Sequence, residues 1–233
     1  MPSDGGKESL WFPFFRQAAR RPDEEFREIN EEIQSGADRD SLEIASAWAL
    51  RTRDLQKAIL RHQPQIVHFS GLGDEVQGIF LEDHTGELQA VDREALAGLF
   101  EIFRDTIRVV ILNACGSKHQ VGAFSQLIDF TIGMNKPISD KAAVVFASSF
   151  YRGLAFGRTV EDAFRLAVNQ LKIEGIPESD TPELLMREGA NSSEPLLIRA
   201  QPGRDETIAN LSVNNSQIGQ VNIVKGDKNT FIA

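Results

Sequence analysis

Segments of strand length alternate with amphipathic segments of helical length through most of this 233-residue chain. Residues 107–112 form an apolar run typical of a buried strand, and residues 65–70 form a second segment of strand type. In residues 23–34, by contrast, Phe26 and Ile29 fall at helical spacing on one face. Strands that alternate with helices predict a mostly parallel sheet with helices on both of its faces. We therefore expect an α/β sandwich of three layers.

The expected elements follow one another along the chain. We expect helices over residues 23–34, 52–62, 92–103, 139–156 and 159–173. We expect strands over residues 42–48, 65–70, 78–82, 88–91, 107–112 and 130–134. The turn signal at residues 83–86 predicts a hairpin. Residues 177–195 are polar and predict a loop, after which residues 196–198 could add an edge strand.

Composition and charge argue against several classes of protein. The net charge is −9 and the basic residues form no stripe, which argues against a nucleic-acid partner. A single cysteine cannot form an internal disulfide, so we expect a cytoplasmic protein. No apolar run approaches the length of a membrane span, and residues 1–9 lack the apolar core of a signal peptide. The scattered histidines predict no metal site, and no cofactor is expected.

Two loops stand out because each follows an expected strand of the parallel sheet, where sites of α/β proteins form. One begins after Ser70 with Gly-Leu-Gly, and the other is Asn-Ala-Cys-Gly-Ser at residues 113–117. Cysteine attacks as a thiolate, so Cys115 at a strand end is a candidate nucleophile. The alternative is a structural cysteine, because free cysteine is among the most buried residue types.

The segments at residues 66–73 (Ile-Val-His-Phe-Ser-Gly-Leu-Gly) and 110–117 (Val-Ile-Leu-Asn-Ala-Cys-Gly-Ser) resemble the two signature segments of CHAT-domain proteins, relatives of caspases and separases. The resemblance covers roughly residues 23–190 and implies the caspase-like sandwich of a cysteine peptidase. In that family the first segment ends in His-Gly: the histidine activates the cysteine, and the glycine amide helps to bind the oxyanion. By position Cys115 matches the nucleophile and Gly73 the oxyanion glycine, whereas Leu72 occupies the place of the histidine.

This substitution predicts little or no peptidase activity from the chain alone. A leucine can neither take a proton from the thiol nor give one to the leaving amine. Loss of the partner base typically lowers the rate of acyl transfer by several orders of magnitude. His68 lies four residues before Leu72, about 13 Å away along a strand, too far to replace the base. We expect His119 in a solvated loop or helix start, His62 at a helix end and His84 in an exposed turn.

Asp140 invites a second functional interpretation, because relatives with acidic pockets select a basic residue before the cleaved bond. The simpler interpretation is that Ser139 or Asp140 caps the helix over residues 139–156. Phe150 and Tyr151 lie in the same expected helix, and we expect them to pack in the core rather than to contact substrate.

The sequence predicts three parts: a degenerate N-terminal segment over residues 1–22, a CHAT domain over residues 23–200, and a flexible β-prone tail over residues 201–233. In the tail, Gln217, Ile218 and Gly219 resemble the amyloid signalling motifs that link bacterial effector domains to NLR-type sensors, and also the RHIM motifs of animal necroptosis proteins. Alternating β-formers and amide side chains favour cross-β stacking. A disordered or loosely docked tail is the alternative.

Together these features favour a caspase-like effector or adaptor of a bacterial conflict or immune system, catalytically impaired, whose tail recruits it to a partner. A second hypothesis is an active cysteine endopeptidase that uses an unrecognised or partner-supplied base. A third is a protein-interaction module without chemistry. The expected partner is a protein, either as substrate or as sensor.

Overall fold

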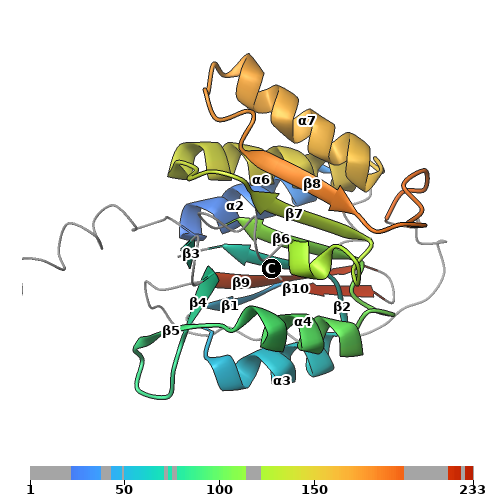
Figure 1. The fold of residues 1–233 in the computed structure, drawn as a ribbon. Coiled ribbons are helices and arrows are strands. Elements are labelled where there is room, and N and C mark those ends of the chain that lie inside the picture. Colours follow the sequence, from blue (N-terminus) through green and yellow to red (C-terminus); the bar gives the residue numbers. More distant parts are fainter. Residues whose placement is uncertain are drawn as a thin grey trace, which may run out of the picture.

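The computed structural model describes residues 22–37, 43–48, 50–70, 73–74, 78–113, 122–196, 220–226 and 229–232. It confirms the expected three-layer α/β sandwich, in which a central sheet lies between two groups of helices (Figure 1). The helices on one side are α2 (Pro22–Ser35), α6 (Asp140–Ala155) and α7 (Val160–Ile173). Those on the other side are α3 (Thr52–His62) and α4 (Arg93–Ile102).

The central sheet has the strand order β1-β10-β9-β2-β6-β7-β8. Its members are β1 (Glu43–Trp48), β2 (Pro64–Ser70), β6 (Val109–Asn113), β7 (Phe130–Met134), β8 (Pro182–Met186), β9 (Gln220–Gly226) and β10 (Asn229–Ile232). Strands β2, β6 and β7 are parallel neighbours, and β8 runs antiparallel to β7. The carboxyl ends of β2 and β6 therefore lie at the same edge of the sheet.

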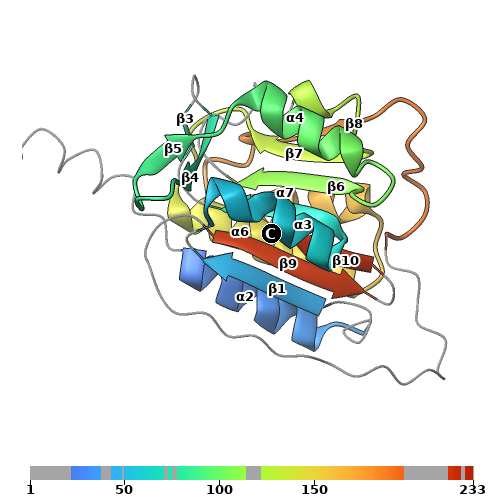
Figure 2. The ribbon, with the colours of Figure 1, turned by 90° about the horizontal axis from the view of Figure 1, so that it is seen from below.

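Alternating residues of the central strands pack against opposite helix layers, as the period of two in a strand requires. Ile66 and Ile111 belong to one core cluster, which contains the buried residues of α2, α6 and α7. Val67 and Val110 belong to the second cluster, with the buried residues of α3 and α4. Figure 2 shows α3 and α4 on the near side of the sheet, seen from below. Both faces of the sheet are thus buried, which accounts for the continuous apolar strands.

Local sequence signals set most helix boundaries. Ser139 caps α6, Thr159 caps α7 and Asp92 caps α4, and each side chain accepts a hydrogen bond from a backbone N–H of the first turn. Helices α2, α3, α4, α6 and α7 agree with the predicted ranges to within two residues at either end. The expected packing of Phe150 and Tyr151 is also confirmed, because both are fully buried.

A second, small sheet consists of β3 (Gly73–Asp74), β4 (Gly78–Glu82) and β5 (Leu88–Ala90). The predicted hairpin between β4 and β5 is confirmed. Asp83 Oδ1 accepts hydrogen bonds from the backbone N–H of Thr85 at 2.7 Å and of Glu87 at 3.0 Å. Gly86 has a φ of +89°, a conformation that a glycine adopts without strain.

The predicted loop over residues 177–195 is wrong in part, because it contains β8. Pro, Glu, Leu, Leu and Met are poor strand signals, and the segment lacks the alternation of a half-buried strand. The strand forms because the free edge of β7 offers hydrogen-bonding groups, which pair with β8 over five register positions from Phe130↔Met186 to Met134↔Pro182. Leu196 is the one residue of the expected edge strand at residues 196–198 that the structure describes. It is buried but lies outside any strand.

Two segments of the expected tail take part in the central sheet. β9 lies antiparallel to β2, with the registers His68↔Asn222 and Ser70↔Gln220, and antiparallel to β1. β10 follows as its hairpin partner and also pairs with β1 and β2. The β-forming character expected of the tail is therefore present in these two segments. Gln217, Ile218 and Gly219 lie outside the described residues.

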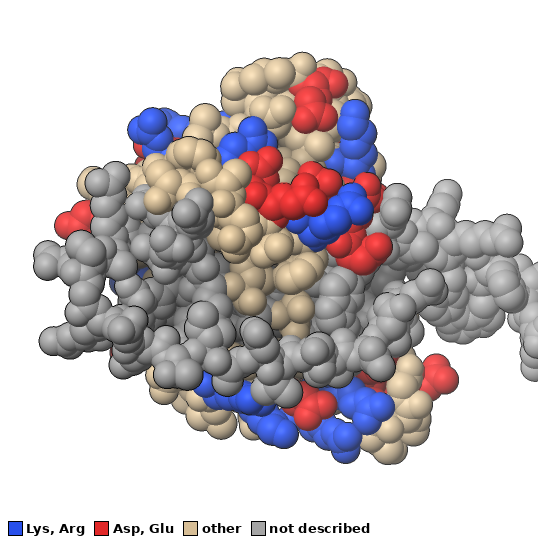
Figure 3. Space-filling model, turned by 180° about the vertical axis from the view of Figure 1, so that it is seen from behind, with Lys and Arg blue, Asp and Glu red and all other residues tan. Residues whose placement is uncertain are grey.

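Acidic and basic side chains are interspersed on the face shown in Figure 3, and its described part has no continuous basic stripe. This distribution accords with the net charge of −9, and the exclusion of a nucleic-acid partner stays a prediction. Within the described part of the chain, no helix combines the length and the apolar character needed to cross a bilayer.

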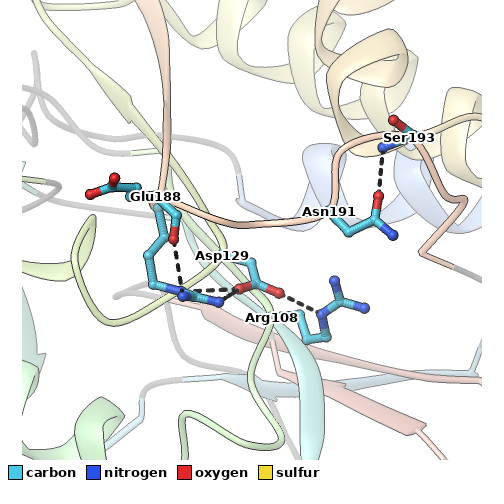
Figure 4. Close-up of polar contacts among 6 residues, drawn as sticks. Arg108, Asp129, Glu188, Asn191 and Ser193 are labelled. Carbon is cyan, nitrogen blue, oxygen red and sulfur yellow. Dashed lines mark hydrogen bonds and ion pairs between the residues drawn. The ribbon is translucent and has the colours of Figure 1, made fainter.

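An ion-pair cluster ties three strands together at the edge of the sheet opposite the carboxyl ends of β2 and β6. Asp129, which precedes β7, accepts hydrogen bonds from Arg108 Nε at 2.7 Å and from Arg187 Nε at 3.2 Å (Figure 4). Arg108 precedes β6, and Arg187 follows β8. Burial alone would raise the pKa of Asp129, but the hydrogen bonds from Arg187 and Arg108 outweigh it and lower that pKa.

We expect Asp129→Asn to lower the free energy of unfolding by about 1–2 kcal/mol at pH 7, because it removes a charged acceptor shared by two arginines. Urea denaturation followed by circular dichroism measures the loss. Asp180→Asn is the matched control, since Asp180 pairs with Lys136 on the exposed surface and its loss should leave stability unchanged. An equal effect of both substitutions would contradict the structural role given to Asp129.

Candidate functional site

The two loops singled out by the sequence follow neighbouring parallel strands. β2 and β6 pair with Ile66 opposite Val109, and they end at Ser70 and Asn113. Leu72 and Cys115 lie two residues beyond these strand ends, outside the described residues. The structure therefore brings together the two strand ends from which both site positions extend.

Gly73 begins β3 and pairs with Ile79 of β4. The expected oxyanion glycine is thus the first residue of the small sheet, three positions after Ser70 at the end of β2. Its role as an oxyanion donor stays a prediction.

A buried carboxylate lies at the ends of β2 and β6. Glu25, in the first turns of α2, is only 2% exposed, and it is spaced at i, i+4 and i+8 with the buried Ile29 and Ile33. Ser70 Oγ donates a hydrogen bond to Glu25 Oε2 at 2.5 Å. Asn113 Nδ2 donates to Glu25 Oε1 at 2.6 Å. One side chain of α2 therefore joins the last residues of both strands.

The same cluster reaches the first turn of α6. Asn113 Nδ2 also lies 3.3 Å from the carbonyl oxygen of Ala143, to which it donates. Arg152 of α6 pairs with Glu32 of α2 at 3.0 Å, on the more exposed side of the same helix pair. α2, β2, β6 and α6 are thus linked by polar contacts as well as by apolar packing.

His68 lies inside this cluster and is fully buried. Its Nε2 is 3.2 Å from Glu25 Oε1, which is ion-pair distance, but the two groups are not aligned as a hydrogen bond. Its Nδ1 lies 3.3 Å from the hydroxyl oxygen of Tyr151, and the two rings are stacked with centroids 5.8 Å apart. His68 is therefore enclosed between Glu25 and Tyr151 in the interior.

The cluster fixes the charge state of its two acidic groups. Burial alone would raise the pKa of Glu25, but the contacts with His68, Ser70 and Asn113 outweigh it and lower that pKa. Burial raises the pKa of Tyr151, and the negative charge of Glu25 raises it further. At neutral pH Glu25 is therefore ionised and Tyr151 is a neutral phenol.

Asp140 is the first residue of α6, and Ser139 is the cap, because Ser139 Oγ accepts from the N–H of Ala142 at 3.3 Å. Of the two capping residues considered from the sequence, the structure selects Ser139. Asp140 lies three residues before Ala143, whose carbonyl oxygen contacts Asn113, so it is placed near the edge that carries the site. Its role in a substrate pocket stays a prediction.

Two further histidines lie where the sequence predicts them. His62 ends α3, and His84 lies in the exposed turn between β4 and β5. His119 lies outside the described residues. Within the described ranges, no group of three His, Cys, Asp or Glu side chains is arranged to hold a metal ion.

Glu25 is the site residue that sequence analysis missed. In the sequence, Glu25 is one of three consecutive acidic residues at the start of a helix, where a negative charge is already explained by its favourable interaction with the helix dipole. The available signal was its spacing, because a carboxylate four residues before Ile29 and eight before Ile33 falls on the apolar face. A charged residue on a buried face requires polar partners, and here β2 and β6 supply them.

We expect Glu25→Gln to lower the free energy of unfolding by roughly 2–4 kcal/mol at pH 7, because it removes a buried charge held by three polar partners. The pKa of Glu25 is lowered below its usual 4.5, so its contribution is complete above that pH and is lost as the pH falls through the folded-state pKa. The difference in stability between the unmodified chain and the variant should therefore shrink below pH 4.5. Urea titrations between pH 3.5 and pH 7 measure it.

Glu32→Gln is the matched control for this experiment. It changes the same helix but breaks only the pair with Arg152, whose side chain is 40% exposed, so its effect should be smaller at pH 7. A difference between the unmodified chain and Glu25→Gln that stays constant or grows in acid would contradict the assignment.

One family model and two known proteins are similar to this chain. The family model for the CHAT domain matches residues 2–181, so the match begins nearer the N-terminus than the resemblance read from the motifs. A Roc-COR-CHAT protease from an unknown prokaryotic organism is 26% identical over 160 residues, which cover 66% of this chain and 15% of that protein. A probable protease from Gillisia limnaea is 23% identical over 137 residues, 58% of this chain and 24% of that protein. The chain thus spans less than a quarter of the length of these relatives, and, because the family model matches well over half of it, the chain belongs to the CHAT domain family.

Proposed function

We propose that this chain is a caspase-like CHAT effector or adaptor of a bacterial conflict or immune system, with its peptidase activity weak or lost. The observation that carries the proposal is the residue pair Cys115 and Leu72. The chain keeps a thiol at the position of the family's nucleophile and has an aliphatic side chain at the position of its base. An unassisted thiol is only a few per cent thiolate at neutral pH, and leucine cannot protonate a leaving amine.

The placement of the described histidines supports this proposal. His62 lies beside the amino end of β2, about 20 Å from the strand end that leads to Leu72. His84 lies in the turn of the small sheet, exposed to solvent. His68 is enclosed by Glu25 and Tyr151 and is fully buried. None of these three is placed as an exposed base at the carboxyl edge of β2 and β6.

The protease names of two relatives support a protein as the substrate or partner of this chain. Both relatives are much longer than the chain, and one carries Roc and COR in its name. An active endopeptidase is therefore the second candidate, in which another protein part supplies the missing base or completes the site. Asp140 would then select a basic residue before the cleaved bond. A binding module without chemistry is the third candidate.

We expect Leu72→His to give measurable Cys115-dependent cleavage of candidate protein substrates, whereas the unmodified chain cleaves at least about 100-fold more slowly. The physical reason is that the new imidazole can take the thiol proton and return it to the leaving amine. Cleavage is measured by gel and mass spectrometry over several hours.

The double substitution Leu72→His and Cys115→Ala is the control, and it should abolish the gained activity. Robust cleavage by the unmodified chain that Cys115→Ala removes would refute the impaired-enzyme proposal and favour the active endopeptidase. Alkylation of Cys115 separates these two candidates independently: an ordinary thiol reacts faster as the pH rises through about 8–9, and an activated thiolate is already fast at neutral pH.

The tail provides a recruitment element in this proposal. Gln217, Ile218 and Gly219 would form the core of a cross-β contact with the matching motif of a partner, such as an NLR-like sensor. The following residues form β9, which pairs with β1 and β2. Pairing within the chain would compete with pairing between chains, so release of β9 from the sheet would favour assembly.

A synthetic peptide of residues 208–233 should form fibres that bind thioflavin T and should seed the same change in fresh peptide. In-register stacking repeats the backbone hydrogen bonds along the fibre, and proline lacks the N–H that this ladder requires. Ile218→Pro should therefore prevent fibre formation, whereas Ile218→Val, which keeps a β-branched side chain, should allow it. A peptide that stays monomeric at high concentration would count against the self-assembly role.

A further inference from the structure

The buried cluster around Glu25 has a position that its stabilising contacts alone do not explain. Its two hydrogen-bond donors, Ser70 and Asn113, are the last residues of β2 and β6. Each donor stands two positions before a site residue, since Leu72 follows Ser70 and Cys115 follows Asn113 at the same spacing. One carboxylate thus holds the two points from which both site loops start.

Covalent geometry limits how far the site can lie from this contact. Consecutive Cα atoms are about 3.8 Å apart, so the Cα of Cys115 lies within about 7.6 Å of the Cα of Asn113. Asn113 itself is fully buried and is held on two sides, by Glu25 Oε1 at 2.6 Å and by the carbonyl oxygen of Ala143 at 3.3 Å. The contacts that hold Asn113 therefore act two residues away from the cysteine in the chain.

We propose that Glu25 is a positioning residue that, through Asn113 and Ser70, fixes the strand ends beneath the two site loops and restrains the thiol of Cys115. This inference rests on the proposed function only in taking Cys115 as the reactive group of the site. Glu25 does not act on the substrate. It acts through the two donors, and α2 thereby connects the helix layer to the loops.

The surroundings of Glu25 suit a fixed anchor. Among the described residues, Ser70 and His68 from β2 and Asn113 from β6 face its carboxylate, while Tyr151 of α6 packs behind His68. A side chain that is 2% exposed has little contact with bulk water, so its hydrogen bonds are not readily exchanged for bonds to solvent. Such contacts hold a single geometry, unlike those of an exposed pair.

The test is the rate of alkylation of Cys115, the only cysteine, by iodoacetamide in the full chain between pH 6.5 and pH 9. We expect Glu25→Gln to raise the rate roughly three- to tenfold across this whole range, because a released strand end lets the thiol sample more accessible positions (about 0.7–1.4 kcal/mol by RT ln of the fold-change). In an Asn113→Ala background the same substitution should change the rate by less than twofold, since Glu25 acts through Asn113.

Three outcomes would overturn the proposal. The first is an unchanged alkylation rate in a folded Glu25→Gln variant, and the second is an equal change of the rate in the unmodified and the Asn113→Ala backgrounds. The third is a shift in the pH at which the alkylation rate rises, in place of a uniform change, which would indicate a direct charge effect. Glu32→Gln, on the same helix, is the control and should leave the rate unaltered. If Glu25→Gln does not fold, Ser70→Ala is tested in its place, both alone and together with Asn113→Ala. A rise in the alkylation rate that requires Asn113 supports the proposal, and the absence of such a rise contradicts it.

This test is separate from the test of peptidase activity. Alkylation reports the environment of the thiol whether or not the chain cleaves protein. If the unmodified chain proves to be an active peptidase, the proposed function fails while the positioning result stands. If the alkylation rates do not respond to Glu25, the positioning inference fails while the role of Leu72 is unaffected.

Discussion

The hydrogen bonds between Glu25 and the ends of β2 and β6 are the contact on which the candidate site depends. A carboxylate in the interior is costly unless polar partners surround it, and here Ser70, Asn113 and His68 meet that requirement together. The four groups come from three segments far apart in the sequence, α2, β2 and β6. Helix α2 and the two strands must therefore assemble in one arrangement for the carboxylate to be satisfied.

The opposite edge of the sheet is held in a different way. Asp129 joins Arg108 and Arg187 in a partly exposed cluster, so solvent screens these charges and weakens their contribution. The carboxyl edge, in contrast, uses a fully buried network with defined geometry. This difference fits the general arrangement of parallel α/β sheets, in which the loops that carry chemistry extend from the carboxyl ends of the strands.

The chain belongs to the CHAT family, and the proposal drawn from Leu72 is that its peptidase activity is weak or lost. The sheet keeps the arrangement in which two neighbouring strands lead to Leu72 and Cys115. The described histidines are buried, distant from the carboxyl edge or on the small sheet, which supports the proposal that none of these residues acts as the base. A CHAT fold with the proposed altered site is compatible with binding, recruitment or activation by a partner.

The sequence alone determined the order and type of α2, α3, α4, α6 and α7 and of the strands β1, β2, β4, β5, β6 and β7, because apolar periodicity, capping residues and the turn at residues 83–86 are local signals. It also predicted Cys115, Leu72 and Gly73 as site positions, through motifs that are contiguous in the chain. Only the tertiary structure decided that residues 182–186 form β8, since the edge of β7 supplies the partner that their own propensity does not. It alone also assigned Glu25 to the site, because a buried charge is defined by neighbours brought together from distant segments, and no local pattern contains them.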